Sequence, residues 1–150
     1  MQSLETLAKS QKEFIMNPKP MNKELIIIDD DDILLVILEK MFGKINPNLK
    51  ISTFIKGSDA LTFLKNSEFN QPPTLLVDLH LKDLKDWDFL DKLETDDRFR
   101  SKVFIITSSV NSENPSKSKR YKNVAGFFEK PLTFDIIQRI NQLIVESNPN

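Results

Sequence analysis

The chain has 150 residues, a length typical of a single domain. Its 21 Lys and Arg residues nearly balance its 22 Asp and Glu residues, so there is no strong positive charge to bind nucleic acid, and no nucleic-acid partner is expected. The lack of Cys excludes disulfides, thiolate metal sites and Cys nucleophiles, and a single histidine, His80, excludes metal sites built from several histidines. Carboxylates, hydroxyls and lysines must therefore carry any chemistry.

Residues 1–22 differ from the rest of the chain. Leu4, Leu7 and Phe14 allow a short amphipathic helix, which Pro18 and Pro20 separate from the first strand. Charged residues interrupt the segment, so it is not a signal peptide, and no apolar run in the chain is long enough to span a membrane. We expect an N-terminal leader or short helix at 1–22, a main domain at 23–147, a tail at 148–150 and a cytoplasmic location.

Five short apolar runs, each followed directly by polar residues, indicate strands. They cover residues 25–28, 51–55, 74–77, 103–106 and 126–128. Continuous apolar runs of this length are typical of parallel strands that are buried on both faces.

Between the first two runs, the apolar spacing is that of a helix. Ile33, Ile37 and Met41 follow one another at intervals of four residues. Gly43 is expected to end this helix, since glycine is a common C-terminal stop.

The later connections also carry helix signals. One helix is expected after Ser58 and extends to about Asn66, another contains Phe89, Leu90 and Leu93, and Thr133 is expected to cap the last. The segment 114–122 is polar nearly all round and predicts a helix only weakly.

The alternation of strands and helices predicts the fold class. Parallel strands need crossover connections, and these are right-handed, so helices cover both faces of the sheet. We therefore predict an α/β domain with a doubly wound, open, five-stranded parallel sheet.

Polar side chains gather where the predicted strands end. In an open α/β sheet, ligands bind outside the carboxyl ends of the strands. Four aspartates beginning with Asp29 and Asp30 follow the first strand, Asp78 the third, Thr107 the fourth and Lys130 the fifth. Placing the negative charges of Asp29, Asp30 and Asp78 close together is unfavourable unless a cation lies among them. Mg²⁺ fits this need, because it binds only a few carboxylates and leaves other coordination positions for phosphate oxygens.

The charges of this predicted site are informative. The three carboxylates and Lys130 leave a formal charge of −2, which a divalent cation would neutralise. An aspartate nucleophile beside a metal ion and a lysine indicates phosphoryl transfer through an aspartyl phosphate.

Four segments together resemble the signature of CheY-like response-regulator receiver domains. They are IIIDDD at residues 26–31, LLVD at 75–78, IITS at 105–108 and FFEKP at 127–131. The resemblance covers about residues 24–147, and therefore assigns the predicted domain at 23–147 to this class. It implies a flavodoxin-like fold with strand order 2-1-3-4-5.

The resemblance also implies roles for individual residues. Asp78 would be the phospho-acceptor, and Thr107 and Lys130 would each bond a phosphoryl oxygen. Mg²⁺ would be bound by Asp30, Asp78 and the backbone carbonyl of His80, and by Asp29 mainly through water.

Two further features follow from the same resemblance. Phe127 occupies the position of the family's aromatic switch residue. The peptide bond between Lys130 and Pro131 is expected to be cis.

The implied protein is a signalling domain and not an enzyme, apart from its own phosphorylation and dephosphorylation. Its partners would be a sensor histidine kinase or a phosphotransfer protein, and a downstream protein reached by contact or by onward phosphate relay. No membrane partner is expected, and homodimer formation is left open. Because the sequence ends at Asn150, directly after the last predicted helix, we expect a receiver of the stand-alone type.

The loop after Asp78 departs from the family pattern. Lys82 stands where a proline is usual, and Asp86 where a glycine is usual, so the loop at 79–86 is expected to have a different shape. His80 replaces a smaller polar residue, which is expected to change hydrolysis of the phosphoryl group.

Two other functions remain open at this point. A phosphatase of the haloacid-dehalogenase type would use Asp29 as its nucleophile, with Asp31 in the same motif and with Thr107 and Lys130 in the next two. The acidic motif expected after the lysine is missing. A non-phosphorylated adaptor would keep its function without Asp78.

Overall fold

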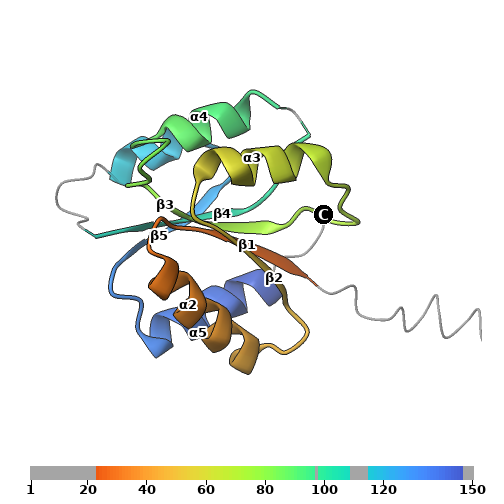
Figure 1. The fold of residues 1–150 in the computed structure, drawn as a ribbon, viewed down its shortest axis with the longest axis vertical. Helices are drawn as coiled ribbons and strands as arrows, with labels where there is room; N and C mark the ends of the chain where they lie inside the picture. Colours follow the sequence, from red (N-terminus) through yellow and green to blue (C-terminus); the bar gives the residue numbers. More distant parts are fainter. Residues whose placement is uncertain (1–22, 97, 109–114, 147–150) are drawn as a thin grey trace, which may run out of the picture.

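Residues 23–96, 98–108 and 115–146 are described by the structure, which is a computed structural model. Five strands form one parallel sheet in the order β2-β1-β3-β4-β5 (Figure 1). The strands are β1 (Glu24–Ile28), β2 (Lys50–Phe54), β3 (Thr74–Asp78), β4 (Val103–Thr107) and β5 (Val124–Glu129). The predicted fold class and strand order are confirmed.

The helices lie on both faces of this sheet, as a doubly wound fold requires. They are α2 (Asp32–Ile45), α3 (Gly57–Asn66), α4 (Asp88–Glu94), α5 (Phe134–Val145) and a 3₁₀ helix, η1 (Pro115–Arg120). Figure 1 shows α3 and α4 on one face, and α2 and α5 on the other. The leader or short helix predicted at 1–22 and the tail predicted at 148–150 lie outside the described residues.

The two faces of the sheet contribute to two separate hydrophobic cores. In β1, Ile26 and Ile28 pack toward α3 and α4, whereas Leu25 and Ile27 pack toward α2 and α5. All four side chains are fully buried. This two-sided burial is the physical reason why the strand appears in the sequence as a continuous apolar run.

Helix α2 begins as predicted but ends later. The Asp31 carboxylate accepts hydrogen bonds from the backbone N–H groups of Ile33 and Leu34, each at 3.1 Å, and so caps the helix. The prediction that Gly43 ends the helix is wrong. The helix continues through Gly43 to Ile45, and the N–H of Asn46 donates to Phe42 O at 2.8 Å at its end.

The buried face of α2 is not the one marked by the spacing of its isoleucines. Ile33 is 69% exposed and Ile37 is 47% exposed. Leu35, Leu38 and Phe42 are buried instead, in the core shared with α5. Because α2 is apolar on more than one face, its sequence predicts a helix but not which face is buried.

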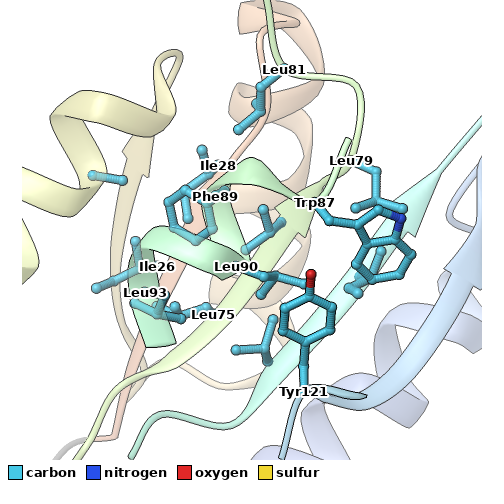
Figure 2. Packing of buried hydrophobic residues seen from close by; sticks show 14 of the residues in the cluster. Ile26, Ile28, Leu75, Leu79, Leu81, Trp87, Phe89, Leu90, Leu93 and Tyr121 are labelled. Carbon is cyan, nitrogen blue, oxygen red and sulfur yellow. The ribbon is translucent and has the colours of Figure 1, made fainter. Parts of the chain in front are cut away.

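The weak segment forms a 3₁₀ helix, η1. Residues 116–120 are all Ser, Lys or Arg, so they bring no apolar side chain to the core. Tyr121 follows directly, is buried, and stacks on Trp87 with ring centroids 5.4 Å apart (Figure 2). This stack attaches the end of η1 to the beginning of α4.

No helix within residues 23–96, 98–108 and 115–146 is long and apolar enough to cross a bilayer.

Candidate functional site

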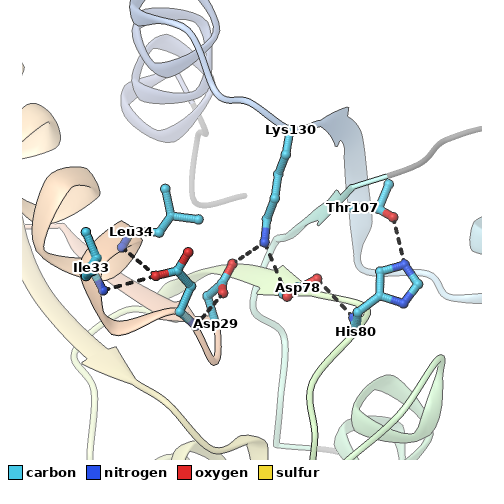
Figure 3. Close-up of polar contacts among 8 residues, drawn as sticks. Asp29, Ile33, Leu34, Asp78, His80, Thr107 and Lys130 are labelled. Carbon is cyan, nitrogen blue, oxygen red and sulfur yellow. Dashed lines mark hydrogen bonds and ion pairs between the residues drawn. The ribbon is translucent and has the colours of Figure 1, made fainter.

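Four neighbouring strands carry polar side chains to one edge of the sheet. Asp29 follows β1, Asp78 ends β3, Thr107 ends β4 and Lys130 follows β5. Because all strands are parallel, their carboxyl ends meet at this edge (Figure 3). Asp29, Asp78 and Thr107 are buried. Burial is unusual for the two aspartates, and all three side chains require polar partners.

Lys130 links two of these carboxylates. Its Nζ lies 2.6 Å from Asp29 Oδ2 and 3.3 Å from Asp78 Oδ2. The Lys130 side chain is only 18% exposed, so the two ion pairs are largely shielded from solvent. The other oxygen of each carboxylate accepts a backbone hydrogen bond at 2.9 Å, from Asp31 to Asp29 and from His80 to Asp78.

The electrostatics of this group follow from burial and pairing. Burial raises the pKa of Asp29 above its ordinary value of 3.8, and the neighbouring Asp78 charge adds to this, whereas bonds from Lys130 and Asp31 oppose it. Burial would lower the pKa of Lys130. Its hydrogen bond to Asp29 and its attraction to both carboxylates outweigh that effect, so the net shift is upward from 10.5.

Asp30 joins the two buried aspartates in a compact cluster. One carboxylate oxygen from each of Asp29, Asp30 and Asp78 lies within 4.8 Å of the others, with Asp30 half-buried at the surface. Three oxygen donors at one point are the ligand set that Mg²⁺ prefers, and Lys130 alone leaves them with excess negative charge. These residues therefore fit a hard divalent cation.

Thr107 makes a contact that the sequence did not reveal. Its Oγ1 shares a hydrogen bond of 3.1 Å with Nε2 of His80, from the loop that follows β3 (Figure 3). Thr107 is fully buried, while His80 is exposed. The loop after Asp78 therefore contacts the end of β4 through a side chain.

Contacts within the loop at 79–86 give it a defined shape. His80 and Lys85 form an antiparallel bridge across it, and Leu79 and Leu81 are buried. Asp86 has φ of 55°, the left-handed region that favours glycine. Aspartate tolerates this conformation better than most residues, which explains how the chain takes it up without a glycine.

Asp83 fastens the same loop to helix α3. Its two carboxylate oxygens accept hydrogen bonds from the backbone N–H of Gly57 at 3.0 Å and of Ser58 at 2.9 Å. Lys56, at the N-cap position, provides no side-chain cap of its own. The helix expected after Ser58 begins one residue before it, at Gly57, and its cap is Asp83. Sequence reasoning missed Asp83 because it lies 25 residues after Ser58 in the chain.

Replacing Asp83 with Ala is expected to lower the free energy of unfolding by about 1 kcal/mol at neutral pH, the usual effect of losing a helix cap. Partial burial would raise the pKa of Asp83, but the hydrogen bonds from Ser58 and Gly57 outweigh it, so the pKa lies below 3.8. The carboxylate therefore stabilises the fold above its ordinary pKa, and this contribution is lost as the pH falls through the lowered value.

Urea unfolding of the unaltered protein and of Asp83→Ala at several pH values measures both effects. The difference should be constant from pH 7 to about pH 5 and shrink below the ordinary pKa of 3.8. Lys82→Ala, an exposed position in the same loop, is the matched control and should change little. A difference that persists unchanged in acid would contradict a role for the charged carboxylate.

Phe127 lies beside the site and not among its polar groups. It is in β5, paired in register with Ile105 of β4, and its half-buried side chain packs against the core under α3 and α4. The peptide bond between Lys130 and Pro131 is cis, as expected.

Known structures share this fold at low sequence identity. A CheY-like receiver domain protein from Methanospirillum hungatei has 21% identity and a TM-score of 0.69, and the match covers 83% of this chain and 95% of that one. The phosphorylated cyanobacterial phytochrome response regulator RcpA has 18% identity and a TM-score of 0.72, with 86% and 99% covered.

A third structure agrees with these two. The signal receiver domain of a DNA-binding response regulator from Colwellia psychrerythraea has 20% identity and a TM-score of 0.72, with 84% of this chain and 100% of that chain covered. No protein-family model and no curated protein sequence matches the chain. The matches cover nearly the whole of each receiver domain, and the chain therefore has the fold of the CheY-like response-regulator receiver domains.

Proposed function

We propose that this protein is a response regulator of two-component signalling, in which Asp78 accepts a phosphoryl group. The observation that carries the proposal is the pairing of Lys130 with both Asp29 and Asp78 at the carboxyl edge of a receiver-type sheet. A lysine held between two buried carboxylates provides positive charge at the point where a phosphoryl group on either carboxylate would lie.

Asp78 is the better nucleophile of the two. Asp29 is fully buried and pairs with Lys130 at 2.6 Å, whereas Lys130 is 3.3 Å from Asp78. Asp78 also ends the central strand β3, next to β4 and its Thr107. A carboxylate held less tightly by its counter-ion has more freedom to attack phosphorus.

The proposed reaction transfers a phosphoryl group from a phosphohistidine. A carboxylate oxygen of Asp78 attacks phosphorus, a P–O bond forms, and the P–N bond to the donor imidazole breaks. The imidazole leaves and takes up a proton. Lys130 would pair with a phosphoryl oxygen, and the Thr107 hydroxyl would donate a hydrogen bond to another.

The acidic cluster would hold Mg²⁺ during this reaction. Asp30, Asp78 and the backbone carbonyl of His80 would be its direct ligands, and Asp29 would act mainly through water. When bound, the ion supplies positive charge that neutralises the phosphoryl oxygens.

The proposed partners follow from the receiver-type fold. A sensor histidine kinase or phosphotransfer protein would donate the phosphoryl group, and a downstream protein would recognise the phosphorylated form. One structural neighbour, RcpA, is itself described as phosphorylated. This role makes the protein a signalling domain in the cytoplasm, where the chemistry is limited to its own phosphorylation and dephosphorylation.

Labelling with a small phosphodonor tests the proposal. The protein is incubated with acetyl phosphate in the presence and absence of Mg²⁺, and the modified peptide is located by mass spectrometry. We expect one phosphoryl group, in the peptide that contains Asp78, only with Mg²⁺. Rapid release of phosphate with label on Asp29 would favour a hydrolase instead, and no label under any condition would favour the adaptor.

Replacing Asp30 with Asn is expected to stabilise the metal-free protein while weakening Mg²⁺ binding. The change removes one of three clustered negative charges, and after screening by Lys130 the gain should be about 1 kcal/mol, or roughly 2–4 °C in melting temperature. Thermal unfolding with and without Mg²⁺ measures both effects.

Asp32→Asn is the matched control for this experiment. Asp32 is an exposed acid in the first turn of α2, outside the cluster, and its replacement should leave Mg²⁺ binding unchanged. Normal Mg²⁺ affinity in Asp30→Asn would remove Asp30 from the proposed metal site.

A further inference from the structure

The imidazole of His80 reaches from the loop after β3 to the end of β4. Nε2 of His80 and Oγ1 of Thr107 are 3.1 Å apart and share a hydrogen bond. Thr107 is fully buried, and its hydroxyl is the group expected to bond a phosphoryl oxygen on Asp78. In the unphosphorylated protein, this hydroxyl is therefore already bonded to a side chain of the acceptor loop (Figure 3).

The backbone around His80 is held in place from several sides. Its N–H donates to Asp78 Oδ1 at 2.9 Å, and the residue is bridged to Lys85 across the loop. Leu79 and Leu81, on either side of it, are buried. Asp83 ties the middle of the loop to the start of α3. These contacts fix the point from which the imidazole extends, so its contact with Thr107 does not depend on a freely moving loop.

The chemistry of the two groups makes this contact relevant to phosphorylation. A threonine hydroxyl has one proton to donate, and a neutral imidazole can accept it at Nε2 when its own proton is on Nδ1. Phosphoryl oxygens are acceptors only. With His80 in that tautomer, the imidazole and a phosphoryl group on Asp78 require the same proton.

We propose that the His80 side chain is a positioning residue that competes with the phosphoryl group for the hydroxyl proton of Thr107. The proposal rests on the function proposed above. His80 holds Thr107 in its unphosphorylated arrangement, and phosphorylation exchanges the bond to Nε2 for a bond to a phosphoryl oxygen. The side chain thus opposes the phosphorylated state, a role separate from any part its backbone carbonyl plays in binding Mg²⁺.

Four proteins test this competition: the unaltered chain, His80→Ala, Thr107→Val and the double variant. The probe is beryllofluoride with saturating Mg²⁺, a mimic of a phosphoryl group, and its affinity is followed by fluorescence of Trp87, the only tryptophan of the chain. In the unaltered background, His80→Ala should tighten binding about fivefold, as expected from the loss of one competing hydrogen bond. In the Thr107→Val background, the same change should have no effect.

Two results would overturn the proposal. An equal change in both backgrounds would mean that the His80 side chain affects beryllofluoride directly, by its bulk or its charge, and not by its hydrogen bond to Thr107. Weaker binding in His80→Ala would mean that the imidazole assists the phosphoryl group.

The nitrogen resonances of His80 give a second, independent measurement. As the only histidine, it provides a single set of imidazole signals in ¹H–¹⁵N spectra. At one fixed, mildly alkaline pH, Nε2 should be unprotonated and its resonance should move in Thr107→Val. Adding beryllofluoride and Mg²⁺ to the unaltered protein should move it toward the Thr107→Val position. A proton on Nε2 would contradict the competition.

These measurements separate failure of this inference from failure of the proposed function. If beryllofluoride binds in an Asp78-dependent manner but the His80 resonance does not move, the function stands and the competition is wrong. If beryllofluoride does not bind the unaltered protein, the proposed phospho-acceptor role is wrong, and the comparison with Thr107→Val still tests the hydrogen bond.

Discussion

Asp78→Ala is expected to abolish Mg²⁺-dependent labelling by acetyl phosphate. The substitution removes the carboxylate oxygen that would attack phosphorus. The other buried carboxylate, Asp29, is held more closely by Lys130, at 2.6 Å against 3.3 Å for Asp78. Intact-protein mass spectrometry measures the labelled fraction. The loss should exceed a hundredfold, since no second nucleophile occupies the same position.

Asp29→Ala is the matched comparison for this prediction. It removes the other buried carboxylate that pairs with Lys130, yet it should leave labelling of Asp78 detectable, although slower. Circular dichroism of both variants controls for folding. The opposite pattern, with label kept in Asp78→Ala and lost in Asp29→Ala, would establish the hydrolase alternative in place of the receiver.

Lys130→Met is expected to lower the free energy of unfolding by about 3 kcal/mol at neutral pH. Lys130 is the counter-ion of two carboxylates that are 0% and 3% exposed, and removing one partner of a buried ion pair leaves uncompensated charge. Methionine keeps most of the side-chain volume, so the loss reflects charge more than packing. Urea unfolding measures it, with Lys122→Met at an exposed position as the control.

The pH dependence of this effect has a defined sign. The pKa of Asp29 is raised in the folded protein, chiefly by burial, so the folded state holds its proton at pH values where the unfolded chain has released it. The contribution of Asp29 is therefore fully present below its ordinary pKa of 3.8 and is lost as the pH rises through the raised value. Without Lys130 the pKa of Asp29 should rise further.

The destabilisation by Lys130→Met should accordingly shrink as the medium becomes more acidic. Added Mg²⁺ should also recover part of it at neutral pH, because the cation would replace the missing positive charge among the carboxylates. A loss of stability that is the same at all pH values and unaffected by Mg²⁺ would indicate a packing defect and contradict the electrostatic explanation.

The elements of the fold could be predicted from local sequence patterns. The run at 25–28 lies within β1, and the Thr133 cap of α5 accepts a hydrogen bond from the N–H of Ile136 at 3.3 Å, as expected. These patterns succeed because burial on both faces of a strand, and capping at a helix end, depend on residues that are close together in the chain. The end of α2 could not be predicted in this way, since Gly43 is compatible with both a stop and a helix interior.

The sequence by itself also determined which chemical groups meet at the carboxyl edge of the sheet. Parallel strand topology is enough to bring Asp29, Asp78, Thr107 and Lys130 together, because each follows or ends a strand. Only the tertiary structure decided how they pair. The loop from β3 carries Asp83 to the start of α3 and the His80 imidazole to Thr107, contacts that join residues 25–27 positions apart. Such contacts depend on the path of the loop in space, which propensity and periodicity do not encode.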